Sequence, residues 1–160
     1  MKVLIVIILL ILPAYLEAQI SQQHVVSVLE ENIVGKKITY KEKYGNTAEF
    51  TYLGILRSKT GEIYKVMKVN SLSGLYKDSQ RSWGGILVFN RNNLLGYYYV
   101  GSELSLPSYI KKNELIFKPS EGCTETTVIN FYNGIPASIF ILCDKKGGDA
   151  WTFYEKNKFD

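Results

Sequence analysis

The stretch ILVFNRNNLLGYYYV, residues 86–100, decides the fold class of this chain. Two apolar arms, 86–89 and 94–100, flank the polar run Asn90–Asn93, which is typical of an antiparallel hairpin with a four-residue loop. Strand alternation divides the apolar residues between two competing faces. One set holds Leu87, Phe89, Leu94, Tyr98 and Val100, and the other holds Ile86, Val88, Leu95, Tyr97 and Tyr99. Since both faces are apolar, we expect both to be covered.

The rest of the chain continues this pattern. Twelve tyrosines and seven phenylalanines accompany many β-branched residues, and these residue types favour strands. Apolar runs bounded by turn residues predict further strands at Ile38–Lys43, Thr47–Leu56, Glu62–Val69, Glu114–Phe117, Thr124–Phe131, Ile135–Cys143 and Ala150–Tyr154. About nine short strands joined mostly by tight turns predict an all-β, mainly antiparallel meander, which forms a small barrel or a sandwich.

Residues 1–18 predict a cleaved secretory signal peptide. Lys2 precedes the unbroken apolar run Val3–Leu12, and the small residue Ala18 marks the expected cleavage point. The run is shorter than the roughly 20 residues that span a bilayer, although an uncleaved anchor is the rival interpretation. After cleavage, residues 19–160 would form a single secreted or periplasmic domain with no stable membrane span.

A short helix is expected between this leader and the first strand. The helix is predicted over Ser21–Asn32, because the apolar residues Val25, Val28, Leu29 and Ile33 fall near helical spacing, and Gly35 would end it. Its apolar stripe could cover one face of the central hairpin. A first strand or a mobile arm is the alternative for this segment.

Charge and histidine content exclude several classes of function. The formal net charge of +4 comes from scattered basic residues, which indicates a solvated surface rather than a nucleic-acid site. His24 is the one histidine and lies beside two glutamines, so we interpret it as part of a solvated helix face. A Ser-His-Asp, Cys-His or histidine-rich zinc site is therefore not predicted. Nor do the glycine pairs have the pattern of a phosphate-binding loop, so no cofactor is expected.

Cys123 and Cys143 are the two cysteines of the chain, and an even count in an exported protein predicts a disulfide. A three-residue loop at 132–134 would pair the strands Thr124–Phe131 and Ile135–Cys143 in a register that places the cysteines opposite each other. The Cα separation of such a pair suits a disulfide. A redox-active or metal-binding thiol pair is the alternative, but the sequence has no C-x-x-C motif.

A long connection, Asn70–Gly85, contains no clear strand. Long loops in compact domains are often functional, and this one carries Tyr76, Arg81 and Trp83, whose residue types are common at binding surfaces. The alternative is that Leu75 and Trp83 simply pack into the core.

These observations predict an exported, non-enzymatic β-domain that binds a small ligand or an extracellular or envelope protein. The candidate binding residues are Tyr76, Arg81, Trp83, Tyr97 and Tyr99, the last two sharing a strand face. A purely structural envelope module is one alternative. The other is a hydrolase of an extracellular polymer that uses two of six carboxylates. These are Glu103, Glu114, Glu121, Glu125, Asp144 and Asp149.

Overall fold

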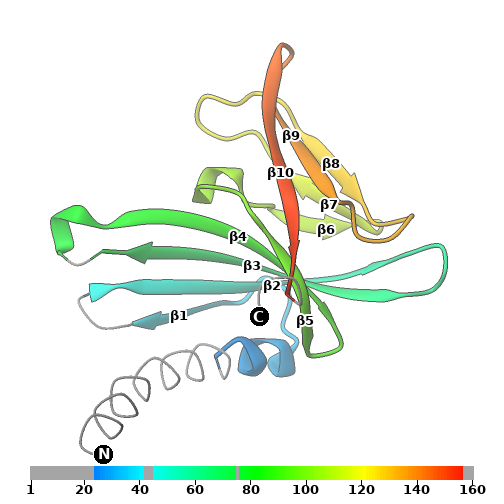
Figure 1. The fold of residues 1–160 in the computed structure, drawn as a ribbon, viewed down its shortest axis with the longest axis horizontal. Coiled ribbons are helices and arrows are strands. Elements are labelled where there is room, and N and C mark those ends of the chain that lie inside the picture. The colour runs from blue at the N-terminus through cyan, green and yellow to red at the C-terminus, as the bar shows by residue number, and fades with distance from the viewer. Residues whose placement is uncertain (1–23, 42–44, 75, 157–160) are drawn as a thin grey trace, which may run out of the picture.

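The computed structural model describes residues 24–41, 45–74 and 76–156. The leader predicted at 1–18 lies outside these residues. Within the described ranges the chain forms antiparallel strands in two sheets, one of seven strands and one of three. The sheets do not close into a barrel, so the predicted all-β fold is confirmed in its sandwich-like form (Figure 1). No helix in the described part of the chain has the length and apolarity needed to cross a membrane.

The seven-stranded sheet has the order β1-β2-β3-β4-β5-β10-β9. Its first five strands follow one another as hairpins, whereas β10 returns from the end of the chain to pair with β5 (Figure 1). The strands are β1 (Lys37–Lys41), β2 (Thr47–Arg57), β3 (Ile63–Ser73), β4 (Arg81–Asn90), β5 (Asn93–Tyr99), β9 (Ser138–Asp144) and β10 (Gly147–Glu155).

The three-stranded sheet contains β6 (Tyr109–Lys111), β7 (Glu114–Phe117) and β8 (Thr127–Asn130). Lys112 and Asn113 form the two-residue loop between β6 and β7, with φ of 50° and 64°. The Asn113 side chain also binds the end of β2. Its Oδ1 accepts from Arg57 N (2.7 Å), and its Nδ2 donates to Arg57 O (2.9 Å). One asparagine thus completes a hairpin and attaches the small sheet to the large one.

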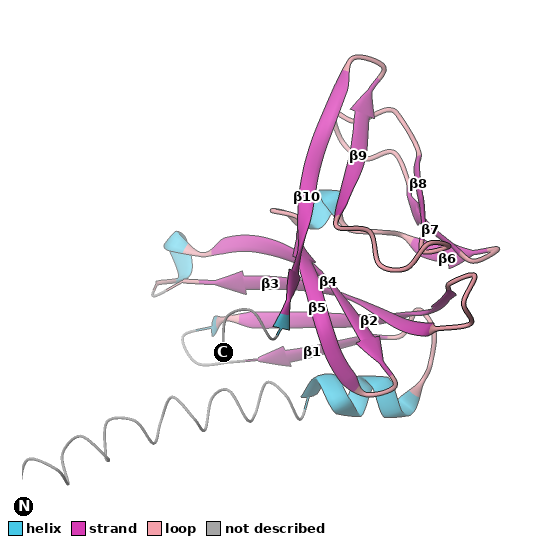
Figure 2. Cartoon of the chain, turned by 45° about the vertical axis from the view of Figure 1, so that its right-hand side comes forward, coloured by secondary structure: helices cyan, strands magenta, loops and turns pink. Residues whose placement is uncertain are grey.

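The large sheet has a hydrophobic cluster on each face. The inner face, toward the small sheet, carries Val66, Ile86, Val88 and Tyr98, which pack with Leu115 and Phe131 among others. The helix face carries Phe50, Tyr52 and Met67, which pack with Val28 and Leu29 of the helix at residues 24–31. Figure 2 shows the helix and the small sheet on opposite sides of the large sheet. The predicted helix, and the cover it gives the sheet, are therefore confirmed.

The predicted division of the central hairpin between the two faces was wrong. Its loop has two residues, Arg91–Asn92, rather than four, and the register shifts by one residue near Leu95. Such a bulge reverses the alternation on one side of it. Tyr98 consequently lies opposite Ile86 on the inner face, whereas Leu87 and Leu94 pack against the helix-face cluster.

The predicted loop Asn70–Gly85 is mostly strand. β3 continues to Ser73, and β4 begins at Arg81 directly opposite it. The connection is limited to residues 74–80 and contains the short 3-10 helix η2 (Lys77–Ser79). Backbone ladder bonds extend this hairpin through a polar stretch that lacks the side-chain pattern of a strand.

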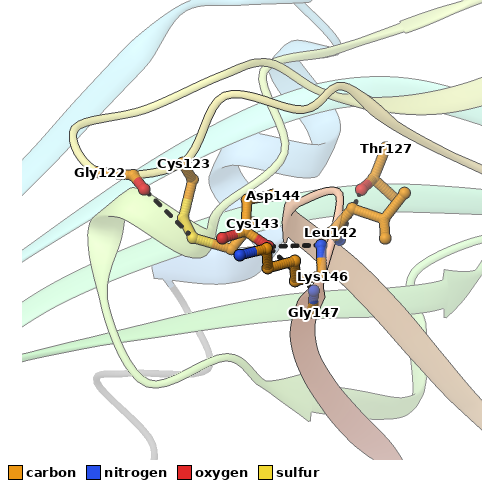
Figure 3. Close-up of a disulfide and its surroundings, with 8 residues drawn as sticks. All are labelled: Gly122, Cys123, Thr127, Leu142, Cys143, Asp144, Lys146 and Gly147. Carbon is orange, nitrogen blue, oxygen red and sulfur yellow. Dashed lines mark hydrogen bonds between the residues drawn. A yellow bond between two sulfur atoms is a disulfide. The ribbon is translucent and has the colours of Figure 1, made fainter.

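The predicted disulfide is present, with a Cα–Cα distance of 4.1 Å between Cys123 and Cys143. The predicted hairpin around it was wrong, because β8 pairs with β7 and β9 pairs with β10. Near the disulfide, Thr124 N donates to Cys143 O (2.7 Å), and Leu142 N donates to the Thr127 hydroxyl (2.8 Å; Figure 3). The disulfide therefore joins the connection between β7 and β8 of the small sheet to β9 of the large one.

Candidate functional site

Two stacked pairs of aromatic side chains lie on the helix face, and we call the four together the aromatic strip: Trp83 of β4, Tyr97 and Tyr99 of β5, and Tyr154 of β10. The rings of Trp83 and Tyr99 stack with centroids 6.1 Å apart. Those of Tyr97 and Tyr154 stack at 5.6 Å. Tyr97 and Tyr99 remain 39% and 46% exposed, so the strip presents aromatic surface to solvent.

Strand register explains why these rings meet. Tyr97 lies directly opposite Tyr154 in the β5–β10 pair, and Tyr99 lies opposite Gly85 in the β4–β5 pair. A Cβ on Gly85 would lie 2.9 Å from the Trp83 ring and 3.0 Å from Val69. The absence of a side chain at Gly85 therefore makes room for the indole of Trp83 beside Tyr99.

Three of the five predicted binding residues belong to the strip, namely Trp83, Tyr97 and Tyr99. Arg81 is exposed on β4, two residues before Trp83 and therefore on the same face. Tyr76 is 76% exposed in the connection before β4, where its backbone bonds with the Ser79 hydroxyl. The ring contacts of the strip do not include Tyr76.

The sequence reasoning missed Tyr154, since nothing local indicates that β10 pairs with β5. It also left open whether the tyrosines of β5 pack or bind. The structure divides them, because Tyr98 is fully buried on the inner face and its hydroxyl donates to Pro136 O (2.6 Å). Burial raises the pKa of Tyr98 above its ordinary value.

A second group of polar side chains, which the sequence reasoning did not single out, lies on the inner face. Thr51 of β2 is directly opposite Lys37 of β1 and Lys68 of β3, so the three form one row across the strands. Glu49 and Asn70 are opposite each other in the next row on the same face. Glu103, in the 3-10 helix η3 (Glu103–Ser105), reaches this group. We call these residues the polar corner: Lys37, Glu49, Thr51, Lys68, Asn70 and Glu103.

Most polar groups of this corner have partners. The Lys37 ammonium lies 2.9 Å from Glu49 Oε1, and this hydrogen bond and charge raise the pKa of Lys37. Asn70 Nδ2 donates to Glu103 Oε2 (2.9 Å). Lys68 Nζ donates to the Pro107 carbonyl (3.0 Å). Burial lowers the pKa of Lys68, and the charge of Lys37 lowers it further, while Glu49 and Glu103 act in the opposite direction.

The prediction that His24 is part of a solvated face was wrong. Its ring stacks on Tyr40 of β1 at 3.6 Å, and Ser27 bonds both the His24 carbonyl and the Tyr40 hydroxyl. An imidazole packed in this way holds the helix against the sheet. The described residues include no group of three or more His, Cys, Asp or Glu side chains able to hold a metal ion.

The carboxylates proposed for hydrolysis are distributed over different elements. Glu103 binds Asn70 at the polar corner, whereas Asp144 accepts the N–H groups of Lys146 and Gly147 in the β9–β10 turn. Glu114 belongs to β7 in the small sheet. A two-carboxylate mechanism remains a prediction from residue type.

No protein-family model matches this chain, and neither a curated protein nor a solved structure is detectably similar to it.

Proposed function

We propose that this chain is a non-enzymatic, exported binding module whose recognition surface is the aromatic strip. The observation that carries this proposal is the stacking of Trp83 on Tyr99 and of Tyr97 on Tyr154, in a part of the helix face where the rings stay partly exposed. Paired rings lose little conformational freedom when a ligand binds, because their side chains are already ordered by one another.

The chemistry of the strip favours a saccharide chain of an extracellular or envelope polymer as the ligand. A pyranose ring has an apolar C–H face that packs on an aromatic ring, and hydroxyls at its edge. Tyrosine combines an apolar ring with a polar tip, so Tyr97 and Tyr99 offer both kinds of contact. Arg81 lies on the same face and adds hydrogen-bond donors.

The test is retention of the purified protein on insoluble cellulose, chitin and peptidoglycan. The variant Tyr97→Ser/Tyr99→Ser removes two exposed rings from the strip. Tyr132→Ser is the matched control, since Tyr132 is 58% exposed but lies in the loop before β9. We expect the double variant to bind the retained polymer at least about tenfold more weakly, which corresponds to about 1.4 kcal/mol. The control should bind as the unchanged protein does.

Equal retention of both variants would overturn the role of the strip. Failure of all three polymers to retain the protein would overturn the saccharide assignment. Capture of a specific protein through Tyr97 and Tyr99 would likewise replace the saccharide with a protein partner.

A further inference from the structure

One edge of the large sheet lacks the protection that edge strands normally have. The strand order ends at β1 on one side and at β9 on the other. Charged side chains, proline or covering segments usually prevent an edge from accepting another strand. β1 has Lys37 and Lys41 at its two ends. β9, with the sequence SIFILCD, has no proline and no charge before its last residue, and Phe140 and Leu142 are 48% and 38% exposed.

Two hydrogen bonds show which backbone groups of β9 point away from β10. Phe153 N donates to Ala137 O (2.9 Å), and the two residues lie directly opposite each other in the extension of the β9–β10 register. Because backbone groups alternate along an antiparallel strand, the even-numbered residues of β9 point outward. Leu142 N accordingly donates to the Thr127 hydroxyl of β8 (2.8 Å) rather than to β10.

Ser138 and Phe140 therefore have open backbone groups at this edge. Among the described residues β9 pairs with β10 alone, and no backbone bond outside the strand ladders involves either residue. Each residue leaves one N–H donor and one C=O acceptor pointing outward. The other end of the edge is closed, because Thr124 N donates to Cys143 O (2.7 Å). The open part is thus limited to residues 138–141, in a hairpin that projects beyond the rest of the sheet (Figure 1).

We propose that this edge is the interface between two copies of the chain, each of which adds its β9 to the other as an antiparallel strand. A two-fold axis at Ile139 places Ser138 of one copy opposite Phe140 of the other. Each of these two pairs exchanges two backbone hydrogen bonds, so every open group of both strands is used once. An axis at Phe140 would instead place Ser138 opposite Leu142, whose N–H already has a partner.

Charge is the reason that a second copy fits β9 and not β1. The formal net charge of +4 opposes self-association, so copies can meet only where like charges stay apart. Two β1 strands paired about Thr39 would place Lys37 opposite Lys41, which is unfavourable. Two β9 strands place no charged side chains opposite each other in the open part. The two Phe140 rings lie diagonally across the axis, at a separation that aromatic side chains can bridge.

Sedimentation equilibrium of the purified protein over a wide range of concentrations tests this proposal. We expect the monomer mass at low concentration and twice that mass at high concentration. Phe140→Lys brings two ammonium groups together across the axis. Phe140→Pro removes an outward N–H that the β10 ladder does not use. Each substitution should raise the dimer dissociation constant at least about tenfold.

Leu72→Lys is the matched control. Leu72 is an apolar strand residue that is 38% exposed, like Leu142, but it lies in β3 within the sheet. This variant should dimerise as the unchanged protein does. Circular dichroism of each variant checks that the strand content is retained, and if Phe140→Pro does not fold, Phe140→Lys decides the question.

Mixing two variants tests the two-fold contact itself. Phe140→Lys and Phe140→Glu should each remain monomeric at concentrations where the unchanged protein is a dimer. An equal mixture of the two should associate at low ionic strength, because opposite charges then approach each other across the axis. A mixture that associates no better than either variant alone would overturn the proposed pairing.

A protein that remains monomeric at its highest soluble concentration would overturn the proposal. So would a dimer that neither Phe140 substitution weakens. A monomeric protein that binds an unrelated extended peptide through β9 would also overturn it, since the edge would then serve a different partner. The interface includes no residue of the aromatic strip, so the saccharide test and the dimer test can fail independently.

Discussion

The two faces of the seven-stranded sheet are built by the same strands and differ in what covers them. The three-stranded sheet packs over the apolar part of the inner face and leaves the polar corner beside it. The helix at residues 24–31 covers part of the helix face and leaves the aromatic strip. Next to this cover, the inner face carries charged and polar side chains, and the helix face carries aromatic rings that stay partly exposed. The comparison shows that the position of the cover, rather than overall composition, decides which aromatic side chains remain exposed.

The largest expected loss of stability comes from a substitution in the buried part of the inner face. Phe131→Ala should lower the free energy of unfolding by about 3–5 kcal/mol, because it removes a fully buried ring and leaves a cavity. Chemical denaturation measures this change. Tyr132→Ala, one residue further and exposed, should change stability by less than about 0.5 kcal/mol. Similar losses in both variants would contradict the assignment of Phe131 to the core.

Removal of the disulfide should cause the next largest loss of stability. The double variant Cys123→Ala/Cys143→Ala is expected to lose about 3 kcal/mol, since the bond closes a loop with a sequence separation of 20. The inner face should loosen before the helix face does. The amide of Leu142 in β9 donates to the Thr127 hydroxyl of β8, and its exchange should accelerate more than exchange at Phe50 in the β2–β3 ladder. Uniform acceleration would show that the disulfide stabilises both faces alike.

A substitution that adds a methyl group under the aromatic strip should cause an intermediate loss of stability. Gly85→Ala would place a Cβ 2.9 Å from the Trp83 ring, and displacing the indole is expected to cost about 1–3 kcal/mol. Tryptophan fluorescence should shift toward longer wavelength as the ring becomes more exposed. Gly147→Ala is the control, because a Cβ there meets nothing within 4 Å. An unchanged spectrum for Gly85→Ala would mean that the indole does not depend on this glycine.

The smallest expected effect is a change in alkaline stability of the inner face. Burial raises the pKa of Tyr64 from 10.0 to about 12, with further contributions from the hydrogen bond and charge of Glu62. Below pH 10 the phenol is protonated in both states, and its contribution to stability is fully present. Between pH 10 and 12 the unfolded state loses its proton first, so this contribution is lost. Tyr64→Phe should therefore lose stability less steeply over this window.

Unfolding followed by circular dichroism at successive pH values measures this slope. Tyr98→Phe should show the same trend, since burial also raises the pKa of Tyr98. A slope identical to that of the unchanged protein in both variants would contradict the pKa directions assigned to these two phenols.

Predictions that depend on nearest neighbours in the sequence were mostly confirmed. Alternation within 86–100 predicted a hairpin that is apolar on both faces, and helical spacing predicted the covering helix. The same reasoning grouped Tyr98 with Leu87 and Leu94, which lie on the opposite face, because one bulged residue, Leu95, shifts the register. It also took Arg81 and Trp83 for loop residues, because ladder bonds continue through a stretch without a strand pattern.

The sequence by itself determined the strand content, the two apolar faces and the cysteine pair. These features depend on local alternation, on composition and on a cysteine count of two. The tertiary structure alone decided that β10 pairs with β5, which brings Tyr154 to Tyr97, and that Lys37, Thr51 and Lys68 share one row. It also paired β8 with β7 rather than with β9. A strand has several possible partners of similar pattern, and packing of the whole chain selects among them.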